Sequence, residues 1–240
     1  MTAFAVWAPA ATLAQVEVAG QRHPMTPAAA PGWWQADLPD AGADVDYAFR
    51  LDGGDPLADP RSPRQPFGTN GVSRSYDHSS FRWTDRGWRG GPLHGSLIYE
   101  MHAGTFTPKG TLDAAIGRLD HLRDLGVDTV ELMPLASFPG DHGWGYDGIN
   151  LWAVYEPYGG PDALKRFVDA CHARRLAVLL DVVYNHVGIG NRLGDFGPYF
   201  TEAHVTPWPC PPPPSPSSRS DRRRVPLVPI ARASRSNLHA

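Results

Sequence analysis

A stretch rich in aromatic and polar side chains, SFPGDHGWGYDGINLWAVYEPYGG, spans residues 137–160. It holds the rings of Trp144, Tyr146, Trp152, Tyr155 and Tyr158 beside the polar side chains of Asp141, His142 and Asp147. Aromatic faces stack on the C–H faces of sugar rings, while carboxylates and imidazoles bond to hydroxyl groups. A loop of this length in a compact domain is usually functional. We therefore expect a sugar-contacting loop, with the alternative that these rings fill the loop's own core.

A second set of polar side chains lies in the stretch LAVLLDVVYNH, residues 176–186. Its apolar run is followed by Asp181, Asn185 and His186. In parallel α/β folds the reacting groups gather at the carboxyl ends of strands. A lone aspartate at such a place is more often a structural hydrogen-bonding carboxylate than a catalytic one, and His186 alone decides nothing. For Glu100 we expect a buried hydrogen-bonding role. Trp33 and Trp34 would suit stacking on a glucan, but packing is the favoured interpretation.

The elements that must position these groups belong to two parts of the chain with different apolar patterns. Residues 1–90 alternate apolar and polar positions, as at Val16 and Val18, and turn clusters recur between the short runs. This pattern predicts a small β-sandwich. From about Ser96 the pattern changes, and three apolar runs alternate with stretches of helical periodicity. The expected strands are 97–103, 128–135 and 176–184, and the expected helices are 112–122 and 161–171.

Strand, helix, strand, helix, strand at this spacing predicts parallel βαβ units, whose strands are covered on both faces. The order alone allows a doubly wound sheet or a barrel. Thr111 is expected to cap the first helix and Pro161 to begin the second. Cys171 is expected to be a buried small hydrophobe on the apolar face of that second helix. The Pro-rich and Arg-rich residues 209–240 predict a disordered tail.

Composition narrows the class of protein. The 240 residues carry a net charge of −3, but residues 209–240 hold six Arg against Asp221 alone, so residues 1–208 carry a net charge of −8. Such an acidic body fits a cytoplasmic enzyme and argues against broad nucleic-acid binding. Two cysteines give neither a disulfide framework nor metal-ligand spacing. The sequence contains no signal peptide pattern and no apolar run of the length, about 18 residues, that spans a membrane.

Several motifs together resemble a known family. VWAP at residues 6–9, ahead of a β-rich region, resembles the N-terminal domain of glycogen-active members of the α-amylase superfamily. The motifs YEMHAGTFTPKGT, FPGDHGWGYDG, DVVYNH and FGPYFTEAHVTPW are similar to the maltooligosyltrehalose trehalohydrolases, a family within that superfamily. The resemblance covers residues 4–208. GTFTP and GWGYDG favour this family over its relative, the glycogen branching enzymes.

The resemblance implies a (β/α)8 barrel, which needs about 250 residues. It implies hydrolysis of the α-1,4 bond next to the trehalose unit of a maltooligosyl trehalose, with that oligosaccharide or a related α-glucan as partner and without a cofactor or metal. Tyr146 matches a tyrosine that stacks under the sugar at the cleavage point, His186 a histidine that bonds to that sugar, and Trp144 lies beside them. Asp181 and Asn185 match supporting residues.

The resemblance also places the nucleophile and the acid/base on the fourth and fifth barrel strands, with a helper acid on the seventh. A retaining glycosidase needs two carboxylates flanking the bond. We expect residues 91–208 to supply only strands 1–3, so that no catalytic residue is assigned and the chain is inactive alone. The abrupt change of composition after Trp208 suggests a shifted reading frame as a hypothesis.

Two other functions stay open at this point. One is a relative of the glycogen branching enzymes, which would form α-1,6 branches. The other is a glucan-binding module without catalysis, which would use the β-rich region and the loop aromatics. A basic-tail interaction protein is a third and weaker hypothesis, since an Arg run is far more often a solvated segment. Three strands of a barrel would leave an open edge and uncovered apolar faces, so we also expect residues 96–208 to be aggregation-prone alone.

Overall fold

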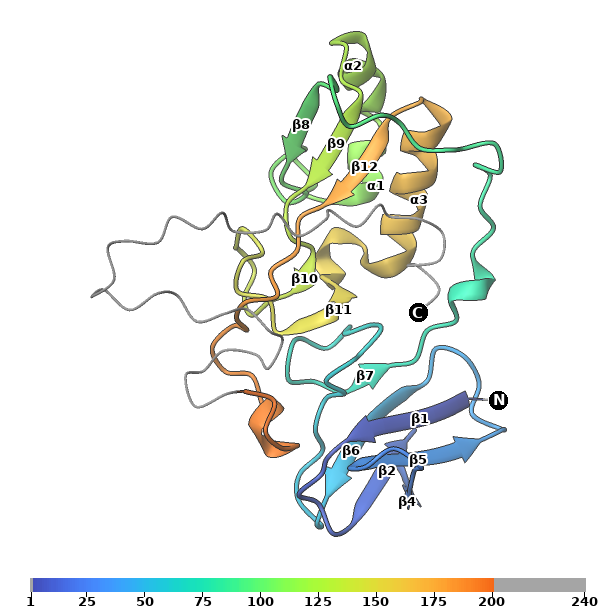
Figure 1. The fold of residues 1–240 in the computed structure, drawn as a ribbon, viewed down its shortest axis with the longest axis vertical. Helices are drawn as coiled ribbons and strands as arrows, with labels where there is room; N and C mark the ends of the chain where they lie inside the picture. The colour runs from blue at the N-terminus through green and yellow to red at the C-terminus, as the bar shows by residue number, and fades with distance from the viewer. Residues whose placement is uncertain (1, 201–240) are drawn as a thin grey trace, which may run out of the picture.

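The computed structural model describes residues 2–200, and the expected disordered tail at 209–240 lies outside these described residues, as does Cys210. Residues 2–74 form two antiparallel sheets. One has the order β1-β5-β4 and the other β3-β2-β6-β7 (Figure 1). Their bounds are β1 Thr2–Trp7, β2 Ala14–Val18, β3 Gln21–Pro24, β4 Thr26–Pro27, β5 Trp33–Leu38, β6 Asp46–Leu51 and β7 Ser73–Arg74.

The alternation seen in the sequence explains how these sheets pack. In β2 the side chains of Ala14, Val16 and Val18 are buried while the residues between them are partly exposed. Phe4 and Val6 of β1 join them in one buried cluster, so the apolar faces of the two sheets share a core. This shared core supports the expected β-sandwich, which stays a prediction as a fold assignment.

The core of these sheets also takes in a segment from far along the chain. Phe196, 2% exposed, belongs to the same buried cluster, and its ring meets that of Phe49 edge-on at a centroid distance of 6.5 Å. Tyr199 donates its hydroxyl to the Trp7 carbonyl at 2.9 Å. In Figure 1 the orange segment that contains η3 (Leu193–Asp195) runs back towards the two sheets. The two antiparallel sheets are therefore packed against Phe196 and Tyr199, which lie far along the chain.

The second half contains the expected parallel sheet. Its order is β12-β9-β8, and both pairings are parallel, which confirms the βαβ prediction. Helices α1, α2 and α3 supply buried side chains to a second core with Val130 and Leu132 of β9. The bounds are β8 Ile98–Met101, α1 Leu112–Ile116, α2 Leu119–Asp124, β9 Thr129–Leu132, α3 Gly160–Ala173 and β12 Ala177–Leu180.

Local signals in the sequence account for the helices, with one difference. Thr111 caps α1 as expected, because its Oγ1 accepts from the Ala114 amide at 3.2 Å. The single helix expected over 112–122 is instead two short ones. The break falls at Gly117 and Arg118, which are the cap residues of the two helices, and Gly117 has weak helix propensity. Pro161 lies in the first turn of α3, and Cys171 is fully buried, which confirms both expectations.

The first parallel strand differs from its prediction. We expected the run 97–103 to be buried, but Ile98, Tyr99 and Glu100 of β8 are exposed and only Met101 is buried. The reason is position: among the described strands β8 pairs only with β9, so it is an edge strand. On the face of the sheet that the helices cover, Met101 of β8 belongs to the buried core. The opposite face of the sheet has no covering layer among residues 2–200.

A hairpin and an extended segment complete the framework around the sheet. The hairpin pairs β10 (Ala136–Ser137) with β11 (Asn150–Val154) and is followed by η2 (Glu156–Tyr158). Residues 76–90, which include η1 (His78–Ser80), contact one face of α3, and we call them the strap. No helix within residues 2–200 has the length and apolar character needed to cross a bilayer.

Candidate functional site

Three of the predicted site residues meet at the carboxyl end of the parallel sheet. Tyr146, in the loop between β10 and β11, donates its hydroxyl to Oδ2 of Asp181 at 3.0 Å. The Nε2 atom of His186 lies 2.9 Å from the backbone carbonyl of Tyr146. Because a carbonyl only accepts, Nε2 must carry the proton, which leaves Nδ1 of His186 as an acceptor when the ring is neutral. The loop after β12 and the hairpin loop are thus joined through side chains that can bond to sugar hydroxyls.

The surroundings of Tyr146 raise the pKa of its hydroxyl above the ordinary value of 10. The hydrogen bond to Asp181 is the largest cause of its raised pKa, followed by burial and by the negative charges of Asp181, Glu100 and Glu131. The ring itself remains 39% exposed. Tyr146 therefore offers an accessible aromatic face whose edge is fixed by Asp181, which is the arrangement needed to stack on a sugar ring.

Glycines hold the two loops in this position. Gly145 has a φ of +88°, and a Cβ there would lie 2.1 Å from the Pro134 carbonyl oxygen. A Cβ at Gly188 would lie 2.2 Å from the carbonyl oxygen of Asp147, and the Gly188 amide donates to Gly148 at 2.9 Å. Only glycine allows these approaches. The GWGYDG motif and the glycine after NHV are thus structural requirements that place Tyr146 and His186 side by side.

Trp144 and Asn185 are placed differently from these three. The Trp144 ring is 63% exposed and tilts against the ring of His102, with centroids 5.2 Å apart. His102 is fixed in turn, because its Nε2 lies 2.9 Å from the Gly143 carbonyl and its Nδ1 lies 3.0 Å from Oγ1 of Thr105. Asn185 is exposed, and its side chain forms no hydrogen bond with residues 2–200. Sequence reasoning missed His102, because the expected strand 97–103 included it, whereas β8 ends at Met101.

Two carboxylates next to this cluster were not predicted as site residues. Glu100 and Glu131 stand opposite each other in the parallel register of β8 and β9, so their side chains lie on the same face of the sheet. Burial raises the pKa of Glu131, and the charges of Glu100 and Asp181 raise it further. The expectation that Glu100 is buried and hydrogen-bonded is wrong: it is exposed at the edge strand. An acid within the second apolar run was the signal for Glu131.

The remaining aromatics divide between core and surface. Tyr155 and Tyr158 are each 5% exposed, and the Tyr155 ring stacks on Phe138 at 4.0 Å. For these two the alternative of filling the loop's own core is confirmed, whereas Trp152 is exposed. Trp34 donates to the Ala8 carbonyl at 3.2 Å, and the guanidinium of Arg61 covers the Trp33 ring at 4.5 Å. Both tryptophans thus have packing contacts, as favoured from the sequence.

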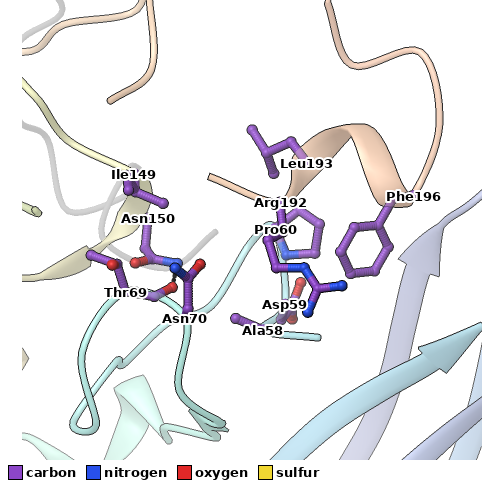
Figure 2. Close-up of a pocket in the computed structure, with 10 residues that line it drawn as sticks. All are labelled: Ala58, Asp59, Pro60, Thr69, Asn70, Ile149, Asn150, Arg192, Leu193 and Phe196. Atoms are coloured by element: carbon purple, nitrogen blue, oxygen red, sulfur yellow. Dashed lines mark hydrogen bonds between the residues drawn. The ribbon is translucent and has the colours of Figure 1, made fainter. Parts of the chain in front are cut away.

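A small cavity elsewhere does not serve as a sugar site. It lies between Thr69 and Asn150 on one side and Arg192 and Phe196 on the other (Figure 2). Its volume is about 20 Å³, which is space for a single water molecule. Within residues 2–200, no group of three or more His, Cys, Asp or Glu side chains is arranged to hold a metal ion.

Comparison with known proteins places these features in a family context. The family described as "Alpha amylase, catalytic domain" matches residues 73–195. Malto-oligosyltrehalose trehalohydrolase of Arthrobacter ramosus is 56% identical over 211 residues, and a 1,4-alpha-glucan branching enzyme of Xanthomonas oryzae is 35% identical over 208 residues. These matches cover 85% and 77% of this chain.

A solved structure shows the same fold. The crystal structure of a Salmonella typhimurium protein assigned as an alpha amylase is 41% identical, superposes with a TM-score of 0.81 and covers 86% of this chain. The shared region is 35% of that protein, and the Arthrobacter ramosus match is 36% of its length. The chain therefore spans about a third of the proteins to which it is similar, and the described parallel strands correspond to part of their architecture.

Proposed function

Because the chain belongs to the α-amylase family, we propose that its residues form one side of the substrate site of a glycoside hydrolase. In this proposal the complete site cleaves the α-1,4 bond next to the trehalose unit of a maltooligosyl trehalose and releases trehalose. The observation that carries the proposal is the meeting of Tyr146, Asp181 and His186 at the carboxyl end of the sheet. The name of the Arthrobacter ramosus relative supports the choice of substrate.

Each residue of the cluster has a distinct role in this proposal. The exposed face of Tyr146 stacks under the sugar at the cleavage point, and Nδ1 of His186 accepts from one of its hydroxyls. Trp144 offers a further exposed ring beside the same loop. Asp181 is a positioning residue, because its carboxylate holds the Tyr146 hydroxyl. Asn185 is a supporting residue whose exposed side chain faces solvent in the described part of the chain.

We further propose that the 240 residues do not hydrolyse the substrate on their own. Retaining chemistry needs one carboxylate as nucleophile and a second as proton donor to the departing oxygen, about 5–5.5 Å apart. Asp181 is engaged by Tyr146, and Glu131 lies within the sheet beside two other acids. As the resemblance to the maltooligosyltrehalose trehalohydrolases implies, we assign the nucleophile and the acid/base to barrel strands other than β8, β9 and β12.

The domain division that we propose follows the same interpretation. Residues 1–90 are a β-sandwich, residues 91–208 are strands 1–3 of a (β/α)8 barrel with their helices, and residues 209–240 are a tail. The acidic body and the absence of a disulfide framework support a cytoplasmic location. The partner is an α-glucan, with neither nucleic acid nor a membrane surface involved.

A chimeric enzyme tests the proposed function. Residues 1–200 would replace the corresponding part of the Arthrobacter ramosus relative, and free trehalose released from maltotriosyl trehalose would be measured. We expect trehalose release that falls at least about fivefold in kcat/KM when Tyr146→Ala is introduced, since a lost stacking face costs roughly 1 kcal/mol or more. A chimera that folds yet releases no trehalose would refute the proposal.

The branching enzyme alternative rests on the 35% identity to the Xanthomonas oryzae protein. It predicts new α-1,6 branches on amylose, not free trehalose, so product analysis of the same chimera separates the two. The non-catalytic alternative predicts that the chain is retained on an amylose column through Trp33 and Trp34 of the β-rich region together with the loop aromatics. Retention that survives Tyr146→Ala but is lost with Trp33→Ala would favour that alternative.

A further inference from the structure

The loop between β10 and β11, residues 138–149, carries the rings of Trp144 and Tyr146 and has little backbone pairing of its own. Within residues 2–200, its first part, residues 139–144, forms no backbone-to-backbone hydrogen bond. In Figure 1 the arrowheads of β8, β9 and β12 point towards this hairpin, so side chains that follow those strands lie near its loop. Because backbone carbonyls require donors, side chains of other elements are the groups that can fix such a loop.

Three carbonyls of the loop, spaced three residues apart, each accept a hydrogen bond from a side chain. The donors come from three different places, since they follow β11, β8 and β12 along the chain. With the donor first, the pairs are Tyr155 to Gly140, His102 to Gly143 and His186 to Tyr146. His102 therefore holds the middle of the loop, between the two other attachment points.

Both ring nitrogens of His102 are engaged, and their partners define its tautomer. Nε2 lies 2.9 Å from the carbonyl oxygen of Gly143, which can only accept, so Nε2 carries a proton. Nδ1 lies 3.0 Å from Oγ1 of Thr105, whose hydroxyl donates to it when the ring is neutral. The hydroxyl oxygen of Tyr158, 3.0 Å from Nε2, is a second acceptor for the same proton. His102 thus presents a defined N–H donor to the loop.

Contacts outside the loop hold the His102 ring in place. Tyr158 is 5% exposed and meets this ring edge-on, with centroids 5.9 Å apart. Burial raises the pKa of Tyr158 to about 12, so its hydroxyl keeps its proton at neutral pH. The amides of Thr105 and Phe106 donate to the His102 carbonyl at 3.2 and 3.1 Å, which fixes the backbone. A Cβ at Gly104 would lie 3.0 Å from Cε1 of His102, so the glycine leaves room for the ring.

The bond to Gly143 bears on the position of Tyr146. Only two residues separate Gly143 from Tyr146, and each residue has just two soft backbone dihedrals. The position of the Gly143 peptide unit therefore limits where the Tyr146 ring can lie. Within residues 2–200 the His102 ring makes no ring contact with Tyr146, so any effect of His102 on Tyr146 passes through the loop.

We propose that His102 is a positioning residue, whose Nε2–H holds the Gly143 carbonyl and thereby sets the place of Tyr146 at the carboxyl end of the sheet. His102 touches no substrate in this proposal and acts only through the loop. Its effect on sugar affinity rests on the proposed function, because that effect takes Tyr146 as the stacking residue. Its effect on the place of the Tyr146 ring does not depend on any ligand.

Two substitutions separate the donor of His102 from its ring. Glutamine brings a side-chain NH₂ group near the position of Nε2 and so keeps the donor, whereas phenylalanine keeps a flat ring but has no donor. His102→Gln should therefore preserve the loop and His102→Phe should release it. A role in packing alone predicts the reverse order. His121→Phe, at an exposed histidine of α2, is the matched control.

Fluorine NMR of the 240-residue chain labelled with 3-fluorotyrosine reports the surroundings of Tyr146, whose resonance is identified by its loss in Tyr146→Phe. We expect His102→Phe to shift this resonance, while His102→Gln and His121→Phe leave it at the wild-type position. Saturation-transfer NMR with maltotriose gives the affinity of the same proteins. We expect it to fall about fivefold in His102→Phe, as for one lost hydrogen bond, and to stay within about twofold in His102→Gln.

The outcomes separate this inference from the proposed function. A Tyr146 resonance that is unchanged in His102→Phe, or shifted equally in His102→Phe and His102→Gln, overturns the positioning role. An affinity that is unchanged in His102→Phe although Tyr146→Ala weakens binding overturns it as well. If Tyr146→Ala leaves maltotriose binding unchanged, the proposed function fails instead, and the resonance alone decides the role of His102. Circular dichroism checks folding, and His102→Asn, which has no donor at the Nε2 position, replaces a His102→Phe chain that does not fold.

Discussion

The hydroxyl group and the ring of Tyr146 have different roles that substitutions can separate. Its hydroxyl bonds to Asp181 at 3.0 Å, and its ring keeps an exposed face. If the ring provides the stacking surface, Tyr146→Ala should weaken binding of maltotriose by about tenfold, while Tyr146→Phe should cost only about twofold to threefold. Retardation in amylose-containing gels measures both variants. Trp152→Ala removes another exposed ring and should leave the mobility unchanged, so equal losses in all three variants would contradict a specific stacking role.

Glu131 gives a prediction about pH because its pKa is raised above the ordinary value of 4.5 by burial and by neighbouring acids. The folded chain therefore holds this proton more tightly than the unfolded chain. The stabilising contribution is complete below the ordinary pKa and is lost as the pH rises through the higher pKa of the folded state. At neutral pH, Glu131→Gln should raise the free energy of unfolding by less than about 1 kcal/mol, because the carboxyl is partly solvated.

Urea denaturation at several pH values checks this expectation. The gain from Glu131→Gln should vanish at about pH 4, where the carboxyl is protonated in both states. Glu17→Gln is a control of opposite sign, because the hydrogen bond from Arg50 lowers the pKa of Glu17. That substitution should destabilise the chain at neutral pH. A loss of stability with Glu131→Gln at neutral pH would contradict the proposed repulsion among the three acids.

At the scale of elements, the segment after β12 is part of the N-terminal core. Phe196 is 2% exposed and packs with Phe49, so Phe196→Ala should destabilise the two antiparallel sheets by about 3–5 kcal/mol, the usual cost of deleting a buried phenylalanine ring. Hydrogen exchange of the β2 and β6 amides measures the effect. Leu125→Ala, at a residue that is 57% exposed, should leave those rates unchanged. Undiminished protection of β2 and β6 in Phe196→Ala would show that the sheets are independent of this segment.

The strap is held to α3 by side chains that recur on one helical face. Asp169 accepts from the Thr84 amide at 2.9 Å, from the Thr84 hydroxyl at 2.7 Å and from the Asp85 amide at 3.2 Å. Along the same face, Lys165 donates to the His78 carbonyl at 3.1 Å, and the His172 ring stacks on Trp88 at 4.4 Å. Asp169 therefore fixes the middle of the strap.

Removing that carboxylate should release the strap locally. In Asp169→Ala we expect trypsin to cleave after the strap's arginines several-fold faster than in the wild type, since local opening exposes these bonds to the protease. These arginines are Arg82, Arg86 and Arg89. Mass spectrometry of timed digests identifies the cleavage sites. Asp124→Ala, which removes an exposed ion pair on α2, is the matched control, and equal cleavage of the two variants would contradict the anchoring role.

At the scale of the whole molecule, the sequence predicted where the helices and strands lie better than it predicted their burial and packing partners. Periodicity located the three parallel strands, and the cap at Thr111 and the burial of Cys171 followed from local chemistry. The exposure of β8 could not be predicted, because burial of a strand depends on which neighbours cover it. The packing of Phe196 against Phe49 could not be predicted either, because it joins residues far apart in the sequence.

The candidate site was predictable in part for the same reason. Motif resemblance selected Tyr146, Asp181 and His186, and their contacts fit those roles, which stay predictions until binding is measured. The place of Glu131 opposite Glu100 depends on the register of β8 and β9, which no local pattern encodes. The expected tendency of residues 96–208 to aggregate also stays a prediction, consistent with the exposed apolar side chains Ile98 and Leu180 at the two sheet edges.

The central claim is that these 240 residues hold a sugar through Tyr146 without cleaving it. Proton NMR of the purified chain with maltotriosyl trehalose measures both properties in one sample, since it records saturation transfer to the bound oligosaccharide and the signals of free trehalose. We predict saturation transfer that is lost in Tyr146→Ala, with no free trehalose after prolonged incubation. Release of trehalose by the wild-type chain alone, or transfer that is unchanged by Tyr146→Ala, would contradict the claim.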